Sequence, residues 1–151
     1  MSKQSTPFSI SIVALALLIL TGCARVAPTT VPTPNLFNLA NSTWTLTAMT
    51  RDGANVPLVA HKPTLEFQSD TLGGSATCNS YSGDYKTQGE IIQVGALRST
   101  LMACADENAM AQESAYLDAL QNARMFELRD NVLKILYGAG KGQLVFARAG
   151  N

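Results

Sequence analysis

Two stretches decide the fold: residues 78–85 read Cys-Asn-Ser-Tyr-Ser-Gly-Asp-Tyr, and residues 99–104 read Ser-Thr-Leu-Met-Ala-Cys. In the first stretch Tyr81 and Tyr85 are an even number of residues apart, so a strand would place both rings on one face. Gly83 between them permits a bend or a bulge. The first stretch therefore predicts a strand with a local irregularity.

Alternation of apolar and polar residues extends the strand pattern in both directions. Between 42 and 50, Trp44, Leu46 and Ala48 are predicted to lie opposite Thr43, Thr45 and Thr47. Turns are expected at 69–74, rich in Ser and Gly, and at Asp130-Asn131, a two-residue hairpin signal. The expected strands cover 42–50, 65–68, 76–78, 82–87, 90–94, 126–128, 133–137 and 144–146.

One helical segment interrupts the strands, from Asp106 to Ala123. Apolar or small residues recur there every three or four positions, and Asp106 and Glu107 suit the helix start. Glu113, Asp118 and Gln121 are expected to face elsewhere, and the expected inner face comprises Met110, Ser114, Leu117, Leu120 and Ala123 or Arg124. Strands joined by short antiparallel links around one helix predict a single α+β domain, with a curved, mainly antiparallel sheet packing one face on the helix.

Length and charge limit the function classes. The chain has 151 residues, with 11 Lys and Arg against 11 Asp and Glu, so it suits one modest domain. Nucleic-acid binding is disfavoured because phosphate contacts require an excess of clustered positive charge. The same balance leaves no polybasic segment for membrane attachment.

The N-terminus has the layout of a secretory signal peptide. Lys3 precedes an apolar run from residue 10 to residue 20, which is shorter than the roughly 20 residues of a membrane-spanning helix. Residues 20–23, Leu-Thr-Gly-Cys, resemble the bacterial lipobox. The resemblance implies cleavage after residue 22 and lipidation of Cys23, which with two or more acyl chains gives lasting anchorage. A buried core helix and an ordinary secretory signal are the alternatives.

The segment after Cys23 is interpreted as a tether. Prolines and threonines dominate residues 24–34, a composition that favours extended, disordered chain. We therefore expect a signal peptide at 1–22, a lipidated tether at 23–35 and a folded domain at 36–151. Ala24, in place of Asp, favours the outer membrane by analogy with Gram-negative lipoproteins, with the domain facing the periplasm.

With Cys23 lipidated, an even pair of cysteines remains outside the cytoplasm, which favours a disulfide between Cys78 and Cys104. Closing that loop would stabilise the fold by roughly 3 kcal/mol on the chain-entropy model. Two buried, reduced thiols are one alternative. A nucleophilic Cys78 with His61 as its base is another.

Other constellations carry no chemical signal. Residues 138–142 contain three glycines around a lysine but lack the spacing of a phosphate-binding loop, so they predict a hairpin turn. The carboxylates Glu66, Asp84, Glu90 and Glu113 are scattered singly, and no His or Cys cluster has metal-binding spacing. We therefore expect no catalytic residue, metal or cofactor.

The two opening stretches resemble the META domain family, the family of the heat-shock lipoprotein HslJ. Its members carry Cys-Asn-x-Tyr/Phe-x-Gly-x-Tyr, followed later by Thr-x-Met-x-Cys and a helix. The resemblance implies a structural role for the shared residues, which besides the cysteines are Asn79, Tyr81, Gly83, Tyr85, Thr100 and Met102. Thr77 departs from the family, which commonly has glycine there, and puts the local backbone in doubt.

The family resemblance also implies envelope stress as the biological context, without an established reaction. The functional hypothesis is a lipid-anchored envelope protein, without enzymatic activity, that binds an envelope protein or a small ligand. An inhibitor or accessory subunit of an envelope enzyme is the second hypothesis. A cysteine-dependent enzyme is the third.

Overall fold

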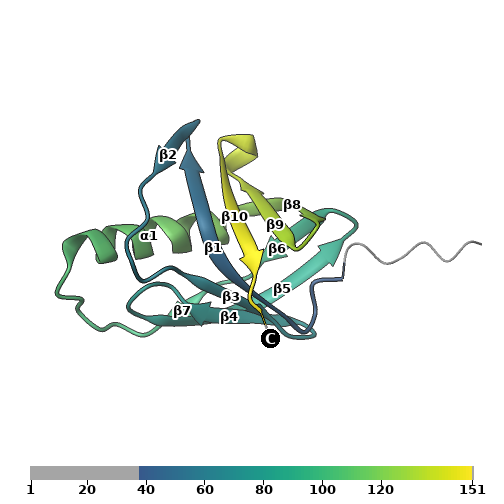
Figure 1. The fold of residues 1–151 in the computed structure, drawn as a ribbon. Helices are drawn as coiled ribbons and strands as arrows, with labels where there is room; N and C mark the ends of the chain where they lie inside the picture. The colour runs from purple at the N-terminus through teal and green to yellow at the C-terminus, as the bar shows by residue number, and fades with distance from the viewer. Residues whose placement is uncertain (1–37, 151) are drawn as a thin grey trace, which may run out of the picture. The chain divides into compact units, whose positions relative to one another are not determined.

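The computed structural model describes residues 38–150, and within them the strands form one antiparallel sheet wrapped around a core (Figure 1). The expected signal peptide and the whole of the expected tether lie outside the described residues. The elements are β1 (Ser42–Arg51), β2 (Ala54–Val56), β3 (Thr64–Phe67), β4 (Thr71–Ser75), β5 (Ser80–Gln88), β6 (Ile91–Val94), β7 (Arg98–Ser99), α1 (Glu107–Gln121), β8 (Ala123–Arg129), β9 (Val132–Tyr137), a 3₁₀ turn (Gly138–Gly140) and β10 (Gly142–Arg148). No described helix has the length and apolar character needed to cross a membrane.

The sheet closes into a barrel, which the sequence pattern did not predict. Its strand order is β10-β9-β8-β6-β5-β4-β3-β1, and β1 also pairs with β10, from Trp44 opposite Arg148 to Arg51 opposite Gly142. Closure removes the free edges that an open curved sheet would expose. Alternation indicates which face of a strand is buried, but not which strand lies beside it.

A bulge in β1 changes the expected inner face. The register with β10 shifts between Leu46 and Ala48, so the next buried residue is Met49, and Ala48 is exposed. Trp44 and Leu46 are buried as predicted. The extra residue of a bulge increases the local twist of a strand, which suits a strand that pairs on both sides of a small barrel.

The prediction of a turn at 69–74 and a strand at 76–78 was wrong. Strand β4 covers Thr71–Ser75, whereas residues 76–79 form a loop. The glycines in β4 allow close strand approach: Gly74 has a φ of 147°, and a Cβ there would overlap the carbonyl oxygen of Thr64. A glycine that suggests a turn in the sequence can instead lie in a strand where a neighbouring backbone leaves no room for a side chain.

Three inter-strand loops meet α1 at one end of the barrel. Gln112 accepts from the amide of Val59 (2.8 Å) in the β2–β3 loop. Glu113 accepts from the amide of Asn79 (2.8 Å) in the β4–β5 loop. Gln121 accepts from the amide of Leu97 (3.0 Å) in the β6–β7 loop. The helix therefore lies across this end of the barrel.

The predicted inner face of α1 was wrong in part: Leu120 is buried as expected and Leu117 packs against the core, but the other buried positions differ. The buried helix residues are Ala109, Gln112, Glu113, Tyr116, Ala119 and Leu120, whereas Met110 is 41% exposed and Ser114 is exposed. Gln112 and Glu113 are polar, yet they lie on the packed side of the helix because their side chains accept hydrogen bonds from loop amides there. The helix bounds agree with the prediction, and the Asp106 side chain caps its start by accepting from the amide of Asn108.

The C-terminal hairpins agree with the sequence analysis. Asp130 and Asn131 have φ values of 47° and 63° and connect β8 to β9, as a two-residue hairpin requires. The glycine-rich segment forms the 3₁₀ turn between the antiparallel strands β9 and β10. These strands supply core residues at the expected alternate positions, among them Phe126, Leu133, Ile135, Leu144 and Phe146.

Candidate functional site

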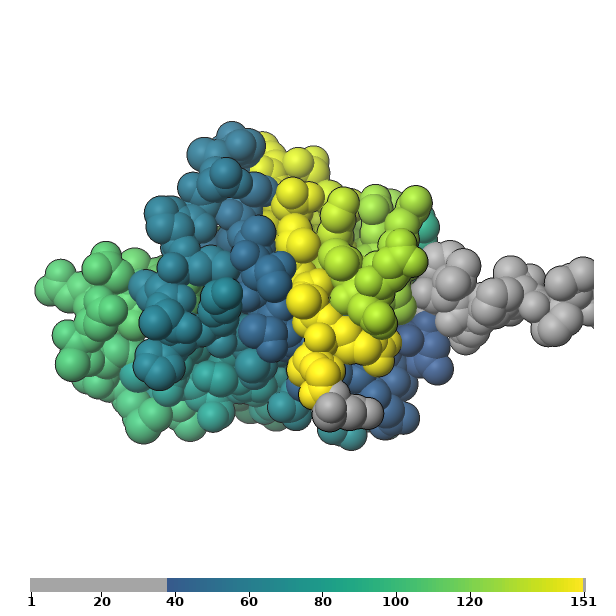
Figure 2. Space-filling model, in the orientation of Figure 1, coloured from purple at the N-terminus to yellow at the C-terminus, as the bar shows by residue number. Residues whose placement is uncertain are grey.

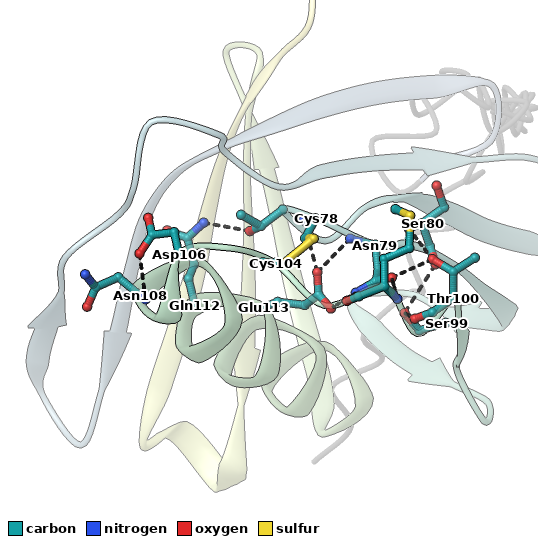
Figure 3. The surroundings of a disulfide bond; sticks show 12 residues. Cys78, Asn79, Ser80, Ser99, Thr100, Cys104, Asp106, Asn108, Gln112 and Glu113 are labelled. Atoms are coloured by element: carbon teal, nitrogen blue, oxygen red, sulfur yellow. Dashed lines mark hydrogen bonds between the residues drawn. A yellow bond between two sulfur atoms is a disulfide. The ribbon is translucent and has the colours of Figure 1, made fainter.

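The two signature stretches meet beside α1, around the buried side chains of Asn79 and Glu113 (Figure 3). Glu113 projects from the helix, and its carboxylate accepts from the backbone amides of Cys78 (3.1 Å) and Asn79 (2.8 Å). It also accepts from Nδ2 of Asn79 at 2.7 Å. One carboxylate thus receives three hydrogen bonds, which compensates for its removal from water.

Asn79 connects this carboxylate to the second stretch. Its Oδ1 accepts from the hydroxyl of Thr100 (2.7 Å) and from the amide of Met102 (2.7 Å). Its Nδ2 donates to the Met102 carbonyl at 3.2 Å as well as to Glu113. Asn79 is only 2% exposed, so its amide group is fully used in joining three segments.

A disulfide joins the same segments covalently. Cys78 and Cys104 are bonded, with their Cα atoms 6.1 Å apart, within the usual range for such a link. Cys78 lies in the loop before β5, not inside a strand as the alternation suggested. Both described cysteines are therefore held in a covalent bond next to the Asn79–Glu113 pair.

Tyr81 lies on the inner face of the first stretch and contacts the helix. Its hydroxyl donates to the carbonyl of Thr64 (2.8 Å) and shares a 2.6 Å hydrogen bond with the hydroxyl of Tyr116. Burial raises the pKa of both tyrosines, with the neighbouring Tyr81 adding to the effect on Tyr116. The pair is a neutral hydrogen-bonded bridge between barrel and helix.

Gly83 and Tyr85 complete the first stretch in structural roles. A Cβ on Gly83 would lie 2.8 Å from Cδ2 of Leu97 and 3.2 Å from the carbonyl oxygen of Ala96, so the glycine admits the loop that crosses β5. The Tyr85 ring packs edge-on against Phe67 at 4.9 Å, and its hydroxyl donates to the carbonyl of Gln68. Both residues shape the barrel wall.

The structure brings Asn79, Thr100, Met102 and the two bonded cysteines together, whereas Gly83 and Tyr85 lie farther along β5 and make other contacts. His61 contributes only its backbone to this cluster. The His61 carbonyl accepts from Nε2 of Gln112, and its side chain is exposed. Among residues 38–150, no group of three or more His, Cys, Asp and Glu side chains is placed to hold a metal ion. The geometry of the assembled residues suits rigid support of two loops.

Sequence reasoning missed Glu113 and Gln112 as members of this cluster. Glu113 was assigned to the wrong side of the helix, and Gln112 was not assigned to either side, because apolar spacing alone defined the expected face. One signal was available: Glu113, Tyr116 and Leu120 follow each other at three- and four-residue spacing. Because this stripe includes a carboxylate, it can be recognised as the buried face of the helix only when a buried partner of that carboxylate, such as Asn79, is already known.

Thr77 has a backbone conformation that favours glycine. Its φ is 140°, and its hydroxyl accepts from Nε2 of Gln112 at 2.8 Å. Strain at such a position costs of order 1–3 kcal/mol, whereas the hydrogen bond contributes about 1 kcal/mol. Thr77→Ala keeps the strain and loses the bond, so we expect it to be less stable than the parent and than Thr77→Gly.

The expected gap between the two variants is about 1–2 kcal/mol in the free energy of unfolding, measured by urea denaturation. Equal stability of Thr77→Ala and Thr77→Gly would show that the backbone at this position is not strained.

Comparisons with solved structures identify the same fold in other bacterial proteins. An NMR structure of a protein from Burkholderia xenovorans has a TM-score of 0.65 and 23% identity, covering 79% of this chain and 93% of that one. The crystal structure of a DUF4847 family protein from Bacteroides vulgatus has a TM-score of 0.57 and 16% identity, covering 75% of this chain and 96% of that one. At these identities the likeness concerns the fold alone.

Comparison with curated proteins gave no match. The family model of the META domain matches residues 37–151, which include both signature stretches, the helix that carries Glu113 and the closing hairpin. The clustered Asn79, Thr100 and disulfide show what the signature residues do in three dimensions. The chain belongs to the META domain family.

Proposed function

We propose that this protein is a lipid-anchored component of the bacterial cell envelope whose META domain acts by binding, without enzymatic activity, to support the envelope under stress. The observation that carries the proposal is that the signature residues use their hydrogen bonds and their disulfide to hold loops of the domain in place. Asn79, Glu113 and both described cysteines are engaged with one another and with loop backbone. Their combined effect is to hold surface loops in one conformation, which lowers the entropic cost of binding a partner.

The proposed anchor is Cys23, in the outer membrane with the domain facing the periplasm. The segment from 24 to 37 separates it from the first described residue, Asn38. Fourteen extended residues at about 3.1 Å each span about 43 Å. That length would let the domain reach partners at some distance from the lipid surface.

Anchoring predicts that Cys23→Ser abolishes metabolic labelling with palmitate and moves the protein from the membrane fraction to the soluble fraction. The cause is the loss of the only thiol that can carry the diacylglyceryl group at the cleavage site. Cys23→Ala is the matched second variant, because it lacks the hydroxyl of serine. Labelling that persisted in both variants would overturn the assignment of the anchor.

The stress role has a separate test. A strain lacking the gene should survive heat and envelope-active antibiotics less well than its parent. The wild-type gene should restore survival, and Cys23→Ser should restore it only partly. Full survival of the deletion strain under both treatments would contradict the role.

The cysteine-dependent enzyme requires a free thiol at Cys78. Titration of the denatured protein with a thiol reagent should therefore detect the Cys78 and Cys104 thiols only after reduction. Two thiols detected without reductant, in protein isolated from the envelope, would favour that alternative over the binding function.

The second candidate function is inhibition of, or accessory binding to, an envelope enzyme. A specific observation favours it: Leu101, between the two residues held by Asn79, is 97% exposed. An aliphatic side chain that is rigidly displayed can act as an anchor that fills a pocket on a partner protein.

A further inference from the structure

The most exposed large apolar residue of the described domain lies inside the second signature stretch. Leu101 is 97% exposed, and the following Met102 is 58% exposed. The chain from Thr100 to Ala103 is neither helix nor turn, and it continues directly from the strand β7. A segment without secondary structure is ordinarily mobile. Specific contacts, however, hold the segment that carries this exposed leucine.

The residues on both sides of Leu101 are held by the side chain of Asn79. On the N-terminal side, the Thr100 hydroxyl donates to Oδ1 of Asn79 at 2.7 Å. On the C-terminal side, the amide of Met102 donates to the same oxygen at 2.7 Å, and the Met102 carbonyl accepts from Nδ2 at 3.2 Å. The buried side-chain amide of Asn79 therefore bonds to the residue before the exposed leucine and to the residue after it.

Two further restraints act on the same segment. The Thr100 amide donates to the carbonyl of Ser80 (3.0 Å), and the Ser80 amide donates to the Thr100 hydroxyl (3.2 Å), which extends the pairing of β7 with β5. Three residues after Leu101, Cys104 is joined to Cys78. The exposed segment is thus held by hydrogen bonds before the leucine and by a covalent bond after it (Figure 3).

We propose that residues 99–103 form an inhibitory loop that occupies the active-site cleft of a serine protease, with Leu101 in an apolar specificity pocket. This inference rests on the proposed binding function and names the partner of the second candidate. Such clefts bind their substrates as extended segments around one dominant side chain. A rigid segment that presents that side chain loses little entropy on binding, as in other pre-organised protease–inhibitor complexes.

The composition of the loop fits an apolar pocket. Residues 99–105 carry no charged side chain, so their burial in a cleft would not remove a charged group from water without a partner. Thr100 and Ala103 are small, which leaves Leu101 and Met102 as the prominent side chains. In the space-filling view, the green atoms of residues around 100–115 form one extremity of the described domain, apart from the dark-blue first residues (Figure 2). The loop is therefore accessible to a cleft.

The same restraints explain why the loop would inhibit and not be consumed. In cleavage, the protease serine oxygen bonds to the Leu101 carbonyl carbon, the bond to the Met102 nitrogen breaks, and the serine proton passes through the enzyme's base to that nitrogen. The Met102 amine stays in place, because the Asn79 side chain and the Cys104 disulfide still hold its residue. Its attack on the acyl carbon then re-forms the peptide bond and breaks the ester bond to the serine oxygen, while a proton returns through the enzyme's base to that oxygen. This step is faster than hydrolysis of the ester by water.

The test uses the mature chain with Cys23→Ser, secreted in oxidised form, titrated against chymotrypsin, whose specificity pocket is apolar, and trypsin, whose pocket carries an aspartate. We expect inhibition of chymotrypsin at micromolar concentrations or below, and weak inhibition of trypsin. Leu101→Lys should reverse this preference, with a change of about 100-fold for each enzyme, and Leu101→Gly should weaken chymotrypsin inhibition by about 100-fold. Met125→Lys, at a 43% exposed methionine on β8, is the matched control and should change neither.

A second variant tests the holding mechanism with little risk to folding. Thr100→Val keeps the side-chain shape but removes the bond to Asn79 and the acceptor of the Ser80 amide. Chymotrypsin should therefore cleave the 101–102 bond at least ten-fold faster, as measured by mass spectrometry. Failure of the parent to inhibit chymotrypsin, or its rapid cleavage at 101–102 with recovery of protease activity, would overturn the proposal. Either failure leaves the Cys23 anchor to be judged by palmitate labelling, so the two results are independent.

Discussion

Glu113→Ala is expected to lower the free energy of unfolding by about 3–5 kcal/mol, as measured by chemical denaturation. The carboxylate accepts from the amides of Cys78 and Asn79 and from Nδ2 of Asn79, all close to the helix. Alanine would leave the amides of Cys78 and Asn79, and one of the two Nδ2 hydrogens, without an acceptor, and it would leave a cavity beneath the loop. Each unsatisfied buried donor costs about 1–3 kcal/mol, so their sum exceeds the effect of an ordinary surface substitution.

Glu113→Gln separates the hydrogen bonds from the general packing of the helix. The glutamine oxygen can still accept from the two backbone amides, but its NH₂ group would face Nδ2 of Asn79, a second donor. We expect an intermediate loss of about 1–3 kcal/mol. Ser114→Ala, on the adjacent exposed position of α1, is the control and should stay within about 0.5 kcal/mol of the parent. A Glu113→Ala protein as stable as that control would show that the carboxylate does not hold the loops.

Alkaline pH is expected to destabilise the domain through Tyr81 and Tyr116. Burial raises the folded-state pKa of both phenols above the ordinary value near 10, so the folded protein retains protons that the unfolded chain releases. Their contribution is complete below pH 10 and is lost as the pH rises above it. Each group contributes a slope of about 1.4 kcal/mol per pH unit, so the pair gives up to about 3 kcal/mol per unit.

The measurement is the free energy of unfolding in urea between pH 8 and pH 11. In the Tyr81→Phe/Tyr116→Phe double variant the two phenols are absent, so the decline above pH 10 should flatten. The double variant should also lose stability at pH 8, because the Thr64 carbonyl loses its donor from Tyr81. An identical decline in parent and double variant would assign the alkaline sensitivity to other groups.

Much of the fold followed from local patterns in the chain. The Asp130-Asn131 hairpin, the limits of the helix and the buried positions of the last three strands were predicted, since turn chemistry and alternation act over a few residues. The exposed Ala48 was not predicted, because a bulge is fixed by pairing with β10 about 100 residues away in the chain. The same limit applies to barrel closure.

In the candidate site, too, some residues could be predicted from the sequence and others could not. Asn79, Thr100 and the two cysteines stood out as a signature, and their family was identified from them. Glu113 did not, because a carboxylate inside a helix is normally placed on the solvent side, and only the position of the Cys78–Asn79 backbone reverses that expectation. The exposure of Leu101 was equally hidden, since an apolar residue between strand and helix is ordinarily expected to pack.

The sequence by itself determined the family, the α+β class, the pairing of the two cysteines as the favoured hypothesis, and the signature residues of the two opening stretches. Tertiary structure alone decided that the sheet closes, which side of α1 faces the barrel, and that Asn79 supports Leu101 from beneath. The reason is physical. Periodicity and turn propensity are set by neighbours along the chain, whereas the partner of a buried polar group is set by which distant segments the core brings into contact.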